Sequence, residues 1–100
     1  MKKLFTLLAL IITFSMNAQM DDNSANNNSA GIYSVAMGYN TQASGWYSTS
    51  MGANTTASGD YSTSMGANTT ASGYTSTALG RYTTASDYAS LVIGQFNSSG

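Results

Sequence analysis

The chain has 100 residues, enough for one small domain, and only 7% of them are charged: three Lys or Arg against four Asp or Glu. Histidine and cysteine are absent, which removes the usual general bases, nucleophiles and zinc ligands. The chain also lacks the clustered Lys and Arg that nucleic-acid phosphates require. We therefore expect no catalysis, no cofactor, no metal and no nucleic-acid partner.

An export signal is predicted at residues 1–19. Two lysines precede an apolar run over residues 4–14 that is too short to span a bilayer; a buried N-terminal helix is the less favoured alternative. Cleavage between Ala18 and Met20 would leave one Arg against four Asp, a formal charge of −3. No second apolar run follows. The mature chain is therefore expected outside the cell or at the cell surface or outer membrane, with any membrane anchor outside this chain.

Residues 20–30 are rich in Asn and Ser and show no apolar periodicity, so they read as a linker or an N-terminal cap. From residue 31 to residue 100 a fourteen-residue repeat takes over, seen at 34–38, 48–52, 62–66, 76–80 and 90–94. A fixed period indicates one supersecondary unit stacked on copies of itself. The last copy stops inside a unit, which predicts a fragment of a longer protein.

The repeat favours β-structure over helix. Each period carries one strongly apolar column, where a coiled coil of two heptads needs four apolar positions. Glycine columns are costly inside a helix, whereas Thr, Tyr and Val suit strands. We predict an all-β solenoid with two short strands per coil, 48–51 and 54–58 in the second copy. Turns with positive φ are expected at Gly38, Gly45, Gly52, Gly59, Gly66, Gly73, Gly80 and Gly94.

Side-chain alternation along the strands predicts which columns point inward. Thr55 and Ala57, with their equivalents, are expected to face the apolar column across the coil, and the small Ser48 and Ser50 to face outward against another chain. Ordering the backbone costs about 1–2 kcal/mol per residue, while burying one Met contributes only about 1.5–3 kcal/mol. An obligate oligomer is therefore predicted. The expected core is Val35, Met37, Met51, Met65, Leu79, Leu91 and Ile93.

Aromatic residues recur beside the second turn and should line up along one edge, because stacked coils lie about 4.8 Å apart. Shielding of the turns is the simpler interpretation; binding of a protein or glycan on a host or neighbouring cell is the alternative. Tyr82 and Phe96 replace a column of Asn, expected to form a hydrogen-bonded ladder, at the first turn. The candidate ligand surface comprises Trp46, Tyr47, Tyr61, Tyr74 and Tyr88, beside Tyr33.

The segment Ser34-Val35-Ala36-Met37-Gly38, followed by Ala43-Ser44-Gly45, resembles the Ser-Val-Ala-Ile-Gly…Ala-x-Gly motif of the YadA-like heads (Hep/Hag type) of trimeric autotransporter adhesins. The resemblance implies a left-handed parallel β-roll, a homotrimer, and adhesion or autoaggregation at the bacterial surface. Transferred by position, it places Ser34, Ala36 and Ala78 at the trimer axis. Three threonines, at 49, 63 and 77, stand where the motif has Val.

A second hypothesis is an ice-binding β-solenoid. Rows of Thr56, Thr70 and Thr84, or of Ser48-x-Ser50, would present regular hydroxyls on a flat face. Gln42 and Ser98 interrupt the threonine row, which counts against this hypothesis. A thermal-hysteresis assay separates it from adhesion.

Overall fold

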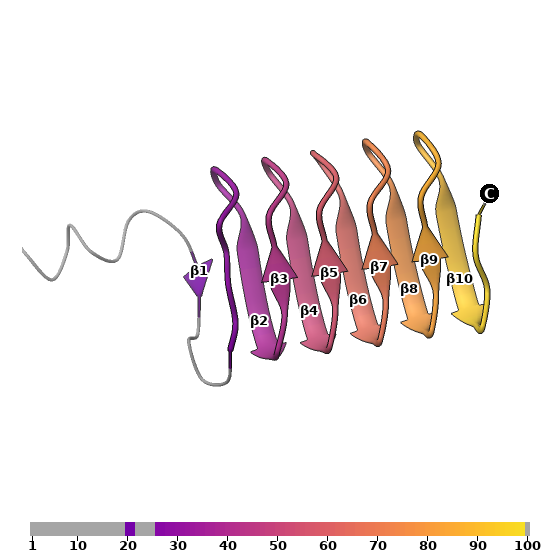
Figure 1. Cartoon of the computed structure of the whole chain (residues 1–100), viewed down its shortest axis with the longest axis horizontal. Helices are drawn as coiled ribbons and strands as arrows, with labels where there is room; N and C mark the ends of the chain where they lie inside the picture. The colour runs from indigo at the N-terminus through magenta and orange to yellow at the C-terminus, as the bar shows by residue number, and fades with distance from the viewer. Residues whose placement is uncertain (1–19, 22–25, 100) are drawn as a thin grey trace, which may run out of the picture.

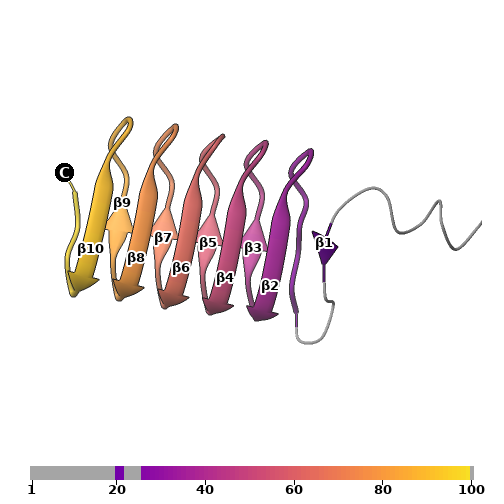
Figure 2. The ribbon, with the colours of Figure 1, turned by 180° about the vertical axis from the view of Figure 1, so that it is seen from behind.

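The computed structural model describes residues 20–21 and 26–99; the predicted export signal at 1–19 lies outside them. Its strands form two parallel sheets that run side by side (Figures 1 and 2). The first contains the long strands in the order β1-β2-β4-β6-β8-β10, and the second contains the short strands in the order β3-β5-β7-β9. The strands are β1 (Met20–Asp21), β2 (Val35–Tyr39), β3 (Gln42–Ala43), β4 (Thr49–Ala53), β5 (Thr56–Ala57), β6 (Thr63–Ala67), β7 (Thr70–Ala71), β8 (Thr77–Arg81), β9 (Thr84–Ala85) and β10 (Leu91–Gln95).

The register between neighbouring coils is fourteen residues throughout β2 to β10. Val35 pairs with Thr49, and Met37 pairs with Met51, so each sequence column becomes a straight row along the solenoid. The same offset joins β4 to β6, β6 to β8, and the short strands to one another. The prediction of an all-β parallel solenoid with fourteen-residue coils is confirmed.

The corners of the coils are built on residues with positive φ, placed every seven residues. They are Asn26, Tyr33, Asn40, Tyr47, Asn54, Tyr61, Asn68, Thr75, Tyr82, Ala89 and Phe96, with φ between 53° and 60°. Two such corners per coil turn the chain from the long strand into the short one and back. Most of these residues are neither Gly nor Asn, although the left-handed region is costly for a side chain with a Cβ.

The glycine prediction is correct for one column and wrong for the other. Gly38, Gly52, Gly66, Gly80 and Gly94 have φ of 119–128°, but they lie within the long strands, just before the corner. Gly45, Gly59 and Gly73 do not have positive φ. Glycine is required there because a Cβ would collide with the backbone carbonyl of the next coil. Asp87, which occupies the same column, does not have positive φ either.

The interior of the coil is filled by Ala, Ser and Thr. Thr55 and Ala57 point inward, as predicted, and so do their equivalents in the neighbouring coils. Facing them are Ser50 and the residues in its column, which are also buried. The hydroxyls of Ser50 and Thr55 lie 2.7 Å apart and share a hydrogen bond across the coil. Side chains as short as Ser and Thr therefore already touch, and the coil has no room for Met.

The predicted core is accordingly wrong in direction. Val35, Met37, Met51, Met65, Leu79, Leu91 and Ile93 point away from the coil interior and are half-buried or exposed. Ser34, Ala36 and Ala78, expected at a trimer axis, lie inside the coil instead and are at most 1% exposed. The prediction of which side chains share a face of the long strands is correct. The prediction of which face is inside is wrong, because the large apolar side chains were placed in an interior that holds only short ones.

Part of the Asn/Ser-rich segment continues the solenoid at its N-terminal end. Asn27 Nδ2 donates to the carbonyl oxygen of Gly38 over 2.7 Å. Asn27 Oδ1 accepts hydrogen bonds from the backbone N and the Oγ1 of Thr41, at 2.9 and 2.8 Å. Strand β1 pairs in parallel with β2, and Asn28 forms a bridge to Gln42. These contacts give the polar groups of the first coil the hydrogen bonds that a preceding coil would otherwise provide.

Candidate functional site

One outer surface is an apolar stripe on the six-stranded sheet. It consists of the outward residues of β2, β4, β6, β8 and β10, namely Val35, Met37, Met51, Met65, Leu79, Leu91 and Ile93, with three threonines interspersed. The paired register places Met37, Met51, Met65, Leu79 and Ile93 in one continuous row. Leu91 is 63% exposed and Ile93 58%. A contiguous row of large apolar side chains on a flat sheet is typical of a protein–protein interface.

The stripe points outward because the inward positions are taken. In β8, Ala78 is buried, so its neighbours Thr77 and Leu79 must face the other side of the sheet. In β10 the buried residue is Val92, flanked by Leu91 and Ile93. The buried hydrophobic residues of the described chain are alanines and this one valine. The larger apolar side chains are therefore not buried by the coil itself.

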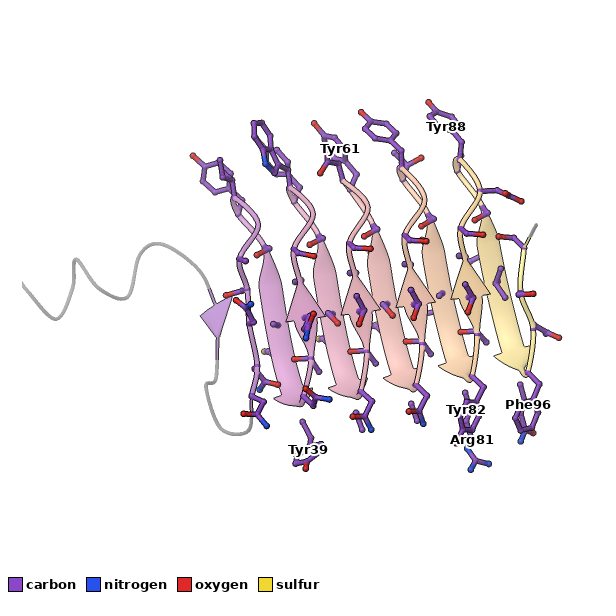
Figure 3. The ribbon with its side chains drawn as sticks, viewed as in Figure 1. Tyr39, Tyr61, Arg81, Tyr82, Tyr88 and Phe96 are labelled. Atoms are coloured by element: carbon purple, nitrogen blue, oxygen red, sulfur yellow. The ribbon has the colours of Figure 1, made fainter. Side chains whose placement is uncertain are left out.

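The second outer surface is a tyrosine ladder along one edge of the solenoid (Figure 3). It consists of Tyr33, Tyr47, Tyr61, Tyr74 and Tyr88, whose successive ring centroids lie 5.2–5.6 Å apart. The ladder changes sequence column between Tyr61 and Tyr74, where the two rings meet edge to face at 68°. The other three pairs are stacked, with interplanar angles of 7–24°. The rings are 46–76% exposed.

Stacking determines what the ladder offers to a ligand. In the three stacked pairs the ring faces cover one another, so ring edges and phenolic hydroxyls remain outermost there. Trp46 lies beside the ladder, is 55% exposed and has no ring partner among the described residues. Its backbone N donates to Asp60 Oδ1 at 2.8 Å. The predicted surface residues Trp46, Tyr47, Tyr61, Tyr74 and Tyr88 are thus brought together on one edge, with Tyr33 added at its end.

The opposite corner carries a different row (Figure 3). Asn40 Nδ2 donates to Asn54 Oδ1 at 2.8 Å, which is one link of the predicted asparagine ladder. Further along, Tyr82 and Phe96 stack with their centroids 5.0 Å apart. The guanidinium carbon of Arg81 lies 5.1 Å from the centroid of the Tyr82 ring, a cation–π contact. This contact is not among the features predicted from the sequence, where its signal is the adjacency of Arg81 and Tyr82.

The hydroxyl rows proposed for ice binding differ in their exposure to solvent. Ser48 and Ser50 are buried, so their rows cannot contact a ligand. The row of Thr56, Thr70 and Thr84 lies half-buried on the outer side of the four-stranded sheet, in parallel register. Gln42 precedes Thr56 in that register.

Neither a metal cluster nor a membrane helix is found in the described part of the chain. Its His, Cys, Asp and Glu residues include no group of three that could hold an ion. Within residues 20–21 and 26–99, no helix has the length and apolar character needed to cross a bilayer.

Comparison with known families identifies the repeat. The family model of the YadA head domain repeat, which comprises two copies, matches residues 29–49, 43–69 and 71–97. No curated protein and no solved structure matches the chain. The matched segments run from β2 through β10 and cover well over half of the chain. The chain therefore belongs to the YadA head domain family.

Proposed function

We propose that this chain is an exported head segment of a bacterial surface adhesin that assembles as a homotrimer and mediates adhesion or autoaggregation without catalysis. The apolar stripe carries the proposal. In a threefold assembly, the stripes of three copies face one another around the axis and become the common core. Membership of the YadA head family supports this arrangement.

The energetics of the single coil favour such an assembly. Burying one Met, Leu or Ile side chain contributes about 1.5–3 kcal/mol. The row that contains Met65 alone supplies one such side chain from each of β2, β4, β6, β8 and β10. The Ala, Ser and Thr interior buries little apolar surface of its own. Chains that leave their larger apolar side chains outside gain most of their hydrophobic stabilisation on association.

Sedimentation equilibrium of the mature chain tests the proposal. We expect a trimeric mass, and we expect Met65→Glu to dissociate it, because three carboxylates would be buried together without partners. Thr70→Glu is the matched control: Thr70 is also half-buried and outward, but on the four-stranded sheet. Its trimer should persist. A monomeric parent chain, or equal dissociation by both variants, would contradict the proposal.

Adhesion itself is tested with beads coated with the trimer. We expect the beads to aggregate or to bind cells, and beads coated with Met65→Glu chains at equal density to do so far less, since a loosened head no longer presents a rigid surface. Coated beads that stay dispersed and bind no cells would argue against an adhesive role.

Ice binding is the weaker candidate. The threonine row on the outer face of β5, β7 and β9 is in parallel register, but the serine rows of the six-stranded sheet are inside the coil. Thermal hysteresis in a solution of the mature chain would favour ice binding over adhesion.

A further inference from the structure

We propose that the tyrosine ladder, together with Trp46, binds an extended, uncharged β-1,4-linked polysaccharide lying along the solenoid axis. The inference rests on the proposed adhesive function and assigns a ligand class to it. Three observations carry it: the spacing of the rings, the atoms that the ladder leaves exposed, and the distribution of charge.

The spacing is set by the fold and matches an extended polysaccharide. Parallel coils are held at the separation of neighbouring strands, about 4.7–4.9 Å, and the tyrosine centroids follow at 5.2–5.6 Å. An extended β-1,4-linked hexose chain advances by one pyranose ring over nearly the same distance. Each successive sugar would therefore meet one tyrosine without losing register. An α-1,4-linked chain curls and cannot remain aligned with a straight row.

The exposed atoms suit sugar hydroxyls. Because ring faces cover one another in the three stacked pairs, the ladder presents mainly phenolic hydroxyls and ring edges. The hydroxyls both donate and accept hydrogen bonds, and the ring edges carry partial positive charge. A polysaccharide offers hydroxyls of the same dual character at each sugar. Trp46 adds what the ladder lacks, an indole without a ring partner that can lie against the C–H face of a pyranose. Trp and Tyr are also enriched among the residues that dominate binding energy at protein interfaces.

Charge favours a neutral ligand. Apart from the phenols, the ionisable groups that the described residues place on this edge are the carboxylates of Asp60 and Asp87. Each of them directly precedes a ladder tyrosine in the sequence. Arg81 lies at the opposite corner, over Tyr82 (Figure 3). An anionic polysaccharide would thus meet like charge on this edge and no cation. A neutral glycan meets neither penalty.

Calorimetric titration of the mature chain with cellohexaose and with chitohexaose tests the inference, with maltohexaose as the α-linked comparison. We expect binding of at least one β-linked hexamer and none of maltohexaose. Trp46→Ala and Tyr61→Asn should each weaken binding by about tenfold or more. Asn is chosen at Tyr61 because it tolerates the φ of 58° found there.

Tyr82→Asn is the matched control. It also replaces an exposed corner tyrosine with Asn at positive φ, but at the opposite edge, where Asn40, Asn54 and Asn68 already occupy the column. Binding should be unchanged. The inference is overturned if neither β-linked hexamer binds, if maltohexaose binds equally well, or if Tyr82→Asn weakens binding as much as Tyr61→Asn.

Sedimentation of the same samples separates this inference from the proposed function. A trimer that binds no β-linked hexamer refutes the ligand class and leaves the adhesive trimer in place. A monomer refutes the proposed function itself, whatever the titration gives.

Discussion

The hydroxyl pairs inside the coil make a sharp prediction at Ala78. Ser50 and Thr55 share a hydrogen bond of 2.7 Å, and Ser64 and Thr69 share one of 2.5 Å. In the next coil the serine is replaced by Ala78, and Thr83 Oγ1 is one of two buried side-chain oxygens in the described residues without a partner. Ala78→Ser should restore the pair.

The expected gain in stability follows from the worth of the new hydrogen bond and from the cost of leaving the Thr83 hydroxyl unpaired. A typical intramolecular hydrogen bond contributes about 0.5–1.5 kcal/mol net, and a buried group left without a partner costs about 1–3 kcal/mol. Supplying the missing serine should therefore stabilise the chain by about 1 kcal/mol. With a urea m-value of about 1–2 kcal/mol/M for a chain of this size, the midpoint of unfolding rises by about 0.5–1 M.

Urea titration followed by circular dichroism measures the effect, at one fixed chain concentration because association contributes to stability. Ala36→Ser is the matched control. Ala36 occupies the same column, but the Thr41 hydroxyl opposite it already donates to Asn27 Oδ1. Ala36→Ser should therefore raise the stability to urea little or not at all. If Ala78→Ser is no more stable than Ala36→Ser, the unpaired Thr83 hydroxyl does not cost the chain stability.

Two pairs of substitutions test the backbone. Gly66→Ala should destabilise the chain by about 3 kcal/mol or more in urea unfolding, because it combines a φ of 124° with a collision against the carbonyl of Gly80. Gly94→Ala is the control, since Gly94 has a similar φ but an added Cβ would meet only the end of a side chain. An equal loss of stability in Gly94→Ala would count against close stacking of the coils as the cause. Thr75→Asn should raise the thermal midpoint, since Asn tolerates the left-handed region where β-branched Thr is strained by about 1 kcal/mol. Asn68→Thr should lower it by a similar amount, and a rise there would contradict the corner assignment.

The period and the polar composition were enough to predict the fold class. Fourteen-residue spacing, two glycine-rich columns and Thr-rich segments pointed to a parallel solenoid, and alternation correctly paired Met51 with Thr49 on one face and Thr55 with Ala57 on another. The tyrosine columns likewise predicted an aromatic edge, because a straight stack of coils leaves no other place for them.

Two features depended on dimensions that a sequence pattern does not contain. Which face is inside depends on the gap between the sheets, and the Ser50–Thr55 hydrogen bond shows that this gap accepts short side chains but not Met. Positive φ at Tyr47, rather than at Gly45, depends on how the corner is built. Gly45 is needed for the approach of the next coil, which is a tertiary contact.

Disulfide cross-linking of single-cysteine variants tests the central claim most directly, since the chain has no cysteine of its own. Met65→Cys and Ser64→Cys are neighbours on β6 that point to opposite sides of the sheet. Under mild oxidation, we expect covalently linked dimers of Met65→Cys on a non-reducing gel, because equivalent residues meet at the axis of the trimer. We expect single chains for Ser64→Cys. Cross-linking at Ser64→Cys with none at Met65→Cys would rule out the apolar stripe as the interface and place the small column there instead.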